Sequence, residues 1–227
     1  MTRVDSHSRA SRASAARTRH RDRAADPSTR DLILDTALKA FSQYGFDGAS
    51  TRSIANEAGV NQGLIPYYFG SKQKLWREAV DRAFAALDDA MGGFDPVRSA
   101  EAGSDEMARW IRRYVAFVAA HPEFVCLMNE EGKRSGPRMA WLVDRHVRPA
   151  LRFVGAVLKR GGTPNARVAH VDPIHFTYIF VGAVATIFHQ AHECREATGY
   201  DPMQPSAVEA HADALVELFL GNAQLGR

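Results

Sequence analysis

Hydrophobic residues recur along most of this chain at the spacing of amphipathic helices, and no stretch alternates in the manner of a half-buried strand. In the clearest case Ile33, Ala37, Phe41 and Tyr44 form one apolar stripe, which Gly45 ends. Prolines and glycines divide the rest of the chain into similar segments. The pattern predicts an all-α protein of about nine helices, at residues 29–44, 51–58, 62–69, 72–91, 105–120, 122–132, 137–160, 173–197 and 206–221.

Two short helices at residues 51–69 form the most informative segment, because a glycine turn joins them. Ser50 can cap the first helix by accepting a hydrogen bond from the amide of residue 52 or 53. Gly59 can adopt the positive φ that ends this helix, and Asn61 can cap the second. The arrangement predicts a helix-turn-helix, whose second helix enters the major groove of DNA while the first crosses the backbone.

The flanks of this segment extend the pattern into a family resemblance. The chain resembles the tetracycline-repressor (TetR) family of bacterial transcription regulators over about residues 29–80. The matching residues are Ala40-Phe41, Gly45-Phe46, Ser50 to Val60, Gly63, Tyr68-Phe69-Gly70-Ser71-Lys72 and Leu75.

The resemblance implies a DNA-binding domain at residues 28–91 and an effector-binding and dimerisation domain at 92–227. It implies three partners, which are a double-stranded DNA operator, a second copy of the chain and a small-molecule effector, with no cofactor and no membrane. Asn61, Gln62 and Leu64 would face bases, whereas other side chains would hold phosphates. The full DNA-binding set is Ser50, Thr51, Arg52, Asn61, Gln62, Gly63, Leu64, Tyr67, Tyr68 and Lys72.

Pro66 departs from the family pattern, which usually has an aromatic residue at this position. Proline lacks the amide that would bond back to the carbonyl of Gln62. We therefore expect the second helix to start tight or kinked, with a changed set of base-reading side chains.

Bulky apolar residues mark the helices after residue 105. Most such residues in a helical domain form its core, but aromatic and methionine side chains from several helices also line ligand cavities. Family members use this half for the effector, so the resemblance favours a pocket. Its predicted lining is Trp110, Tyr114, Phe117, Phe124, Met128, Phe153, Phe176 and Phe180.

The last two long helices are the predicted dimer interface. Gly182 and Ala183 would let a partner helix approach closely, and apolar residues surround them. Packing inside one subunit is the other role open to these residues. The predicted set is Ile179, Gly182, Ala183, Val184, Ile187, Leu215, Val216 and Phe219.

The formal net charge of +3 is unevenly distributed along the chain. The first thirty residues carry eight arginines and three aspartates, a local charge of +5, so the remainder carries −2. Few large apolar residues accompany this charge, which predicts a disordered basic arm at residues 1–27. The arm is a passive tail, a DNA-contacting extension or a transit-like presequence.

Candidate chemistry outside DNA binding is sparse. His189, His192 and Cys194 could hold a metal, although histidines near a helix C-terminus also simply favour the helix dipole. The sequence has no HExxH, GxSxG, Walker or GxGxxG motif, so an enzyme is the least favoured class. Two cysteines without CxxC spacing fit a reducing cytoplasm.

Together with these patterns, the TetR resemblance implies a ligand-responsive transcription regulator in the bacterial cytoplasm. The favoured form is a repressor that binds a near-palindromic operator as a dimer and that a small molecule releases. The alternatives are a helical small-molecule-binding protein without DNA binding and a metal-responsive regulator.

Overall fold

The computed structural model describes residues 27–92, 103–159 and 170–221, and these residues contain helices without any strand. The all-α prediction is therefore confirmed. Residues 1–26 of the predicted basic arm and residues 93–102 lie outside the described residues, whereas Pro27, the predicted last residue of the arm, begins α2. The helices are α2 (Pro27–Gly48), α3 (Thr51–Glu57), α4 (Leu64–Phe69), α5 (Lys72–Ala90), α7 (Gly103–Ala120), α8 (Pro122–Gly132), α9 (Pro137–Leu142), the π-helical turn η1 (Val143–Val147), α10 (Arg148–Lys159), α11 (Pro173–His189), α12 (Ala191–Thr198) and α13 (Pro205–Leu220).

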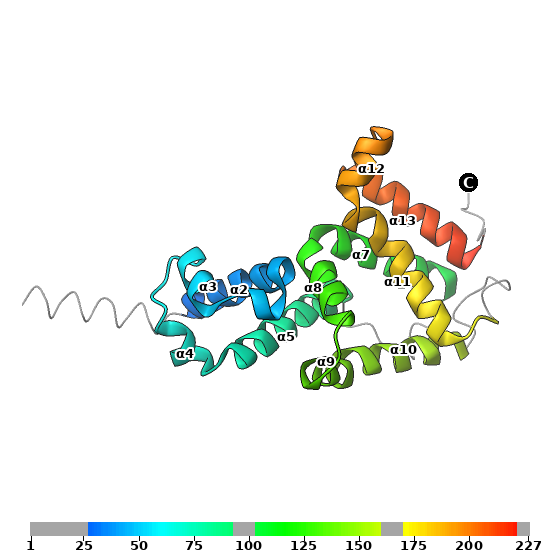
Figure 1. The fold of residues 1–227 in the computed structure, drawn as a ribbon. Coiled ribbons are helices and arrows are strands. Elements are labelled where there is room, and N and C mark those ends of the chain that lie inside the picture. Colours follow the sequence, from blue (N-terminus) through cyan, green and yellow to red (C-terminus); the bar gives the residue numbers. More distant parts are fainter. Residues whose placement is uncertain (1–26, 93–102, 160–169, 222–227) are drawn as a thin grey trace, which may run out of the picture. The chain divides into compact units, whose positions relative to one another are not determined.

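The chain divides into two compact units between Arg82 and Ala83, inside α5. The first unit, here called the head, contains α2, α3, α4 and the beginning of α5 (Figure 1). The second unit contains the remaining helices. The predicted domain boundary after Met91 stays a prediction, since the division by packing falls earlier in the same helix.

The core of the head forms from the apolar stripe of α2 and residues of α5. Phe41 and Trp76 are almost completely buried. Gly45 has a φ of 67°, which interrupts α2 where the sequence predicted its end. The chain can then turn Phe46 back, so that its ring stacks on Phe41 at 5.9 Å and meets the edge of Trp76 at 6.3 Å. The glycine stop therefore contributes to the core as well as ending the helix.

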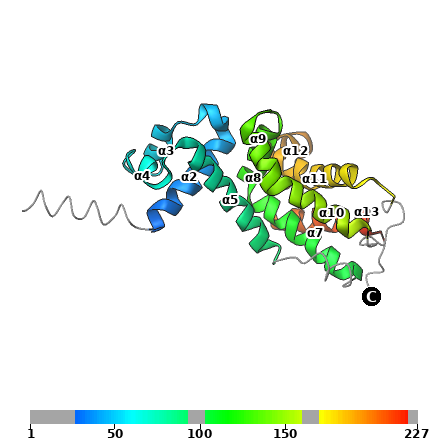
Figure 2. The same cartoon turned by 90° about the horizontal axis from the view of Figure 1, so that it is seen from below.

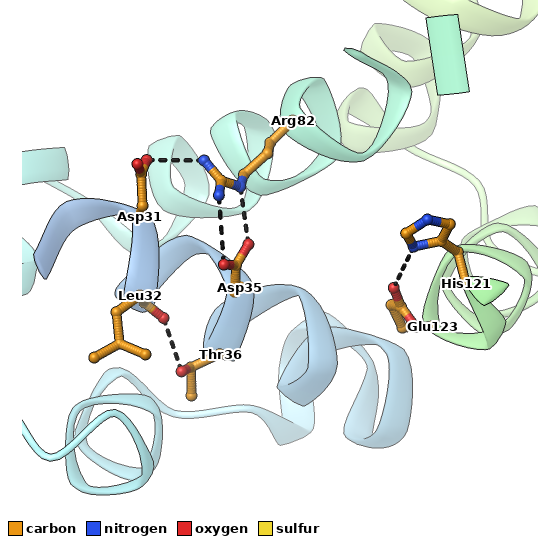
Figure 3. A network of polar contacts seen from close by, with 7 residues as sticks. All are labelled: Asp31, Leu32, Asp35, Thr36, Arg82, His121 and Glu123. Atoms are coloured by element: carbon orange, nitrogen blue, oxygen red, sulfur yellow. Dashed lines mark hydrogen bonds and ion pairs between the residues drawn. The ribbon is translucent and has the colours of Figure 1, made fainter. Parts of the chain in front are cut away.

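Ion pairs on the surface of the head join α2 to α5. The guanidinium of Arg82 lies 2.8 Å from both Asp31 and Asp35, which are one helical turn apart on α2 (Figure 3). Arg30 of α2 pairs with Glu78 of α5. The side chains of Arg82, Asp31 and Asp35 are 40–53% exposed, so each of their ion pairs contributes about 1 kcal/mol or less to stability. Their role is to fix how α2 lies against α5.

The second unit is built around α7 and α11. Helix α13 packs along α7, while α11 contacts α7, α8, α10 and α13 (Figures 1 and 2). Ile111, Val115 and Val118 of α7 are almost fully buried, as is Val184 of α11. An ion pair at 2.8 Å joins the buried Glu131 of α8 to the partly exposed Arg138 of α9. Removing Arg138 would leave the charge of Glu131 buried without this partner, so the pair fixes α9 in place.

Two predicted helices differ from the observed ones. The helix predicted at 173–197 is broken at Gln190, where α11 ends and α12 begins. No glycine or proline occurs between Thr186 and Cys194, so the break has no local sequence signal. The helix predicted at 137–160 is observed as α9, the π-helical turn η1 and α10, which follow one another without a gap from Pro137 to Lys159.

Among the described helices, none alone is long and apolar enough to cross a bilayer, and α11 with α12 meets that test only as a pair bent by 65°.

Candidate nucleic-acid interface

Helix α3 begins with the hydrogen bonds that the sequence predicted. The amide of Ser53 donates to the hydroxyl of Ser50 at 2.9 Å, and the amide of Ser50 donates to the hydroxyl of Ser53 at 3.1 Å. This reciprocal pair is a capping box in which serine replaces the usual acidic residue. Gly59 follows α3 with a φ of 65°, and the amide of Val60 bonds back to Ala55 at 2.9 Å. The predicted cap and glycine turn are both confirmed.

Helix α4 starts two positions later than predicted, at Leu64. The side chain of Asn61 accepts from the amide of Gly63 at 2.8 Å and so orders the turn before the helix. Pro66 then lies in the first helical turn, where amide groups have no partner within the helix anyway. As expected, α4 starts tightly, because the amides of Leu64 and Ile65 bond three residues back, to Asn61 at 2.9 Å and to Gln62 at 3.2 Å. The helix then continues, and the amide of Gly70 reaches the carbonyl of Pro66 at 3.0 Å.

A surface hollow of about 540 Å³ lies on the head. Residues at the start of α3, in and around α4, and at the start of α5 line it. Ser71 stabilises the start of α5, because its hydroxyl accepts from the amide of Lys74 at 3.2 Å. Four residues of the predicted DNA-binding set line the hollow, together with others that the prediction omitted. The lining is Thr51, Gln62, Gly63, Ile65, Pro66, Gly70, Ser71 and Lys72.

The remaining predicted DNA-binding residues do not line this hollow, and their exposures differ. Ser50, Arg52, Asn61 and Tyr67 are exposed, whereas Leu64 and Tyr68 are half-buried. Ile65 and Phe69 are buried, so α4 exposes Pro66 and Tyr67, and Gln62 and Gly63 are exposed in the turn before it. The sequence analysis missed Pro66 as an interface residue, although the predicted helix at 62–69 would place it on one face with Gln62.

Aromatic and cationic groups fix the edges of the interface. The ammonium of Lys72 lies 4.6 Å from the centre of the Phe46 ring, and the guanidinium of Arg30 lies 5.3 Å from that of Phe69. The Tyr67 and Tyr68 rings meet edge to face at 5.2 Å. Cations held against rings keep their charge while losing side-chain freedom. The head therefore presents the positioned ammonium of Lys72 beside exposed hydrogen-bonding groups, which suits a polyanion, whereas the charge of Arg30 is paired with Glu78.

In the second unit, five of the predicted pocket residues pack ring to ring across α7, α10 and α11. Trp110 stacks on Tyr114 at 5.5 Å and contacts Phe180 at 5.8 Å. Phe219 of α13, which the sequence analysis assigned to the dimer interface, joins this group at 5.2 Å from Phe180. The group, here called the α7–α11 ring cluster, consists of Trp110, Tyr114, Phe153, Phe176, Phe180 and Phe219.

Two other predicted pocket residues belong to a separate cluster that includes Phe84 of α5. Phe84 meets Phe124 edge to face at 5.1 Å and stacks on the imidazole of His146 at 4.0 Å. Phe117 contacts Phe124 at 5.5 Å and His121 at 4.4 Å. Met128 on α8 is half-buried. The predicted pocket set is thus divided between two clusters, and its role as one cavity stays a prediction.

Tyr114 provides a test of packing in the α7–α11 ring cluster. Burial raises the pKa of Tyr114 to about 12, whereas an unfolded tyrosine titrates near 10. Between these values the unfolded chain releases a proton that the folded chain retains, so the fold loses stability as the pH rises through this window. We expect the free energy of unfolding to fall more steeply from pH 10 to 12 in the wild type than in Tyr114→Phe. Denaturant titrations would check this, and parallel curves would contradict it.

The predicted dimer-interface residues have two distinct environments. Val184, Leu215 and Phe219 are buried by the same chain, and Ala183, Ile187 and Val216 are half-buried. Ile179 and Gly182 face outward, and a side chain added at Gly182 would meet no atom within 4 Å. The exposed apolar residues of α11 and α13, here called the α11 face, are Ile174, Tyr178, Ile179, Val181 and Leu218.

The candidate metal residues do not converge. His189 lies beside Cys126, with 3.7 Å between Nδ1 and Sγ, whereas Cys194 lies 3.7 Å from the carbonyl of Tyr200. Burial, together with Glu123 and Glu130, raises the pKa of the Cys126 thiol, which disfavours the thiolate that a metal would bind. Within the described ranges, no three histidine, cysteine or acidic side chains are arranged to hold a metal ion.

Comparison with family models identifies both halves of the chain. Residues 33–79 match the model of bacterial regulatory proteins of the tetR family. Residues 104–218, about half of the chain, match the model of the tetracyclin repressor-like C-terminal domain. The first match contains the whole helix-turn-helix, and the second contains both ring clusters apart from Phe84 and Phe219.

Individual proteins give the same assignment. The chain is 35% identical over 112 residues to the HTH-type transcriptional repressor NicS of Pseudomonas putida, covering 48% of this chain and 50% of NicS. It is 33% identical over 114 residues to the repressor SCO4008 of Streptomyces coelicolor, covering 50% of this chain and 55% of SCO4008. The chain thus spans about half the length of these curated relatives.

The fold also has solved relatives. The crystal structure of AibR in complex with isovaleryl coenzyme A and operator DNA superposes with a TM-score of 0.64 at 16% identity, covering 85% of this chain and 98% of AibR. Because family models match the helix-turn-helix and the C-terminal half in the order that the sequence predicted, this chain belongs to the TetR family of bacterial regulatory proteins.

Proposed function

We propose that this chain is a ligand-responsive transcriptional repressor that binds operator DNA as a homodimer in the cytoplasm. The observation that carries the proposal is the hollow on the head. It gathers Thr51, Gln62 and Lys72, from three different helices or their adjoining turns, around one exposed surface. The polar groups can reach base edges and phosphates together, as a helix-turn-helix requires.

A dimer explains how so small a head could select a site. Two recognition helices would read successive major grooves of a near-palindromic operator, with half-sites about 34 Å apart. The α11 face supplies an apolar surface for the second copy, because Ile174, Tyr178 and Ile179 are each 58–65% exposed. Gly182 on the same helix would allow close approach.

Substitutions of Lys72 and Gln62 should separate affinity from specificity. Lys72→Ala removes a phosphate-binding cation, so it should weaken binding to all sequences about equally and lower the salt-dependence slope by about 1. Gln62→Ala should relax preference at one base position by about 1–3 kcal/mol. Fluorescence anisotropy with the wild-type operator and single-base variants, at several salt concentrations, would measure both effects.

Lys39→Ala provides the matched control, because Lys39 is an exposed lysine of α2 outside the hollow. It removes the same charge and should leave affinity nearly unchanged. If the Lys72→Ala and Gln62→Ala proteins keep both affinity and sequence preference, the proposed interface is wrong.

Ligand release would depend on α5. This helix carries Arg82, which binds α2 of the head, and two positions later Phe84, which packs on His146 and Phe124. The head thus contacts the first part of α5, and the second unit contacts the part of the same helix that follows. An effector that binds the DNA-incompetent arrangement better would weaken operator binding, and typical allosteric coupling is about 5–150-fold.

The effector would bind near the α7–α11 ring cluster, because its aromatic side chains come from several helices. AibR, a protein of the same fold, has been crystallised with both isovaleryl coenzyme A and operator DNA. Metabolites of neighbouring genes should be screened for a thermal shift and then for release of the operator, with Trp110→Ala as control. Ligands that stabilise the protein but leave operator affinity unchanged would contradict the release mechanism.

The alternative of a ligand-binding protein without DNA binding rested on Pro66. Since Pro66 lies in the first turn of α4 and leaves its hydrogen bonds intact, that support is weakened. A gel shift on the upstream intergenic DNA of the gene distinguishes the two functions directly.

A further inference from the structure

We propose that Pro66 reads the 5-methyl group of a thymine in the major groove, next to the base that Gln62 reads. The inference rests on the proposed function, since it names the chemistry by which the same interface selects its site. Pro66 is exposed and lines the hollow beside Gln62.

The surroundings of Pro66 leave its ring open to a partner. Gly63 just before α4 and Gly70 just after it line the same hollow and have no side chain that could cover the ring. Among the nearby large side chains, Ile65 and Phe69 are 1–2% exposed and buried in the head, whereas Tyr67 is 69% exposed and does not line the hollow. The ring is therefore a small apolar patch between two glycines on the outer face of α4.

The chemistry of the ring restricts what it can contact. Proline has no amide hydrogen, and its ring carries neither donor nor acceptor. A polar base edge placed against it would lose water and gain no hydrogen bond. The thymine methyl is the one apolar group that base pairs offer in the major groove. Thymine is therefore the base that best matches this position.

Gln62 supplies the neighbouring contact. It is exposed in the turn just before α4 and lines the same hollow as Pro66, and its amide can bond in a bidentate manner to the N6 and N7 atoms of adenine. Asn61 is occupied in part, because its side-chain oxygen accepts from the amide of Gly63 at 2.8 Å. We therefore expect each half-site to contain an adenine that Gln62 binds, next to a thymine whose methyl group contacts Pro66.

The test replaces thymine by uracil, which differs only in lacking the 5-methyl group. A site is first selected from a randomised duplex pool with the full chain, and each thymidine is then changed singly to deoxyuridine. At one position in each half-site the wild type should lose about three- to fivefold in affinity, the effect of withdrawing one methyl group from water. Pro66→Ala, which removes most of the ring, should bind the two duplexes within about twofold.

Pro205→Ala is the matched control, because Pro205 is an exposed proline at the start of α13. It should retain the wild-type thymine preference. If site-specific binding occurs but every uracil duplex binds as tightly as thymine, the inference is wrong while the proposed function stands. A methyl preference that persists in Pro66→Ala assigns the contact to another residue and also overturns it. Failure to select any site contradicts the proposed function itself.

Discussion

Gly182→Arg should convert the proposed homodimer into monomers and lower operator affinity by about 10²–10⁴-fold, because the two half-sites would no longer be held together. Gly182 is exposed on α11, and a Cβ added there meets no atom of the same chain within 4 Å. The substitution thus has room within one subunit, and replacing a helical glycine stabilises a helix by up to about 1 kcal/mol. Sedimentation at micromolar concentration and operator titration would measure the two effects.

Gly132→Arg is the appropriate comparison for this experiment. Gly132 is an exposed glycine at the end of α8, and a Cβ there also meets nothing within 4 Å. Its arginine variant should remain a dimer with unchanged operator affinity. If the wild type sediments as a monomer, or if the Gly182→Arg protein remains a dimer, the α11 face is not the interface.

The sequence could predict most helix ends because their causes are local. Ser50, Gly59 and Pro122 each act through a hydrogen bond, a φ angle or a steric block within a few residues, and each marks an observed boundary. The break at Gln190 has no such signal, since only packing of distant helices distinguishes it from a continuous helix. The later start of α4 depends on Asn61 bonding to Gly63, a turn that competes locally with the helix.

For the predicted pocket, the sequence indicated which aromatic residues pack inside the second unit, but not which rings contact one another. The sequence analysis assigned Trp110, Tyr114 and Phe117 to one pocket, yet Phe117 joins the rings around Phe84 whereas the other two join Phe180. Which rings meet depends on how helices from distant parts of the chain pack. The same limit explains why Phe219 was assigned to the dimer interface although it is buried beside Phe180.

Trp76→Ala should destabilise the head by about 3–5 kcal/mol, the cost of emptying a large buried aromatic site. Trp76 is completely buried in α5, and its ring meets the edge of Phe46, whose ring in turn holds the ammonium of Lys72. Because domains are typically stable by only about 5–15 kcal/mol, operator binding should be largely lost. Chemical denaturation followed by circular dichroism would measure the destabilisation.

Hydrogen exchange would show where this destabilisation acts. Since the chain packs as two units that meet after Arg82, we expect amide protection to fall in α2, α3 and α4 and to persist in α7 and α13. Tyr44→Ala, at a residue of α2 that is 62% exposed, should change stability by about 0.5 kcal/mol or less. Equal loss of protection in both units after Trp76→Ala would contradict this expectation, because the two units would then unfold as one cooperative body. In that case α5 would couple the units more strongly than the ion pairs of Arg82 and the ring contacts of Phe84 imply.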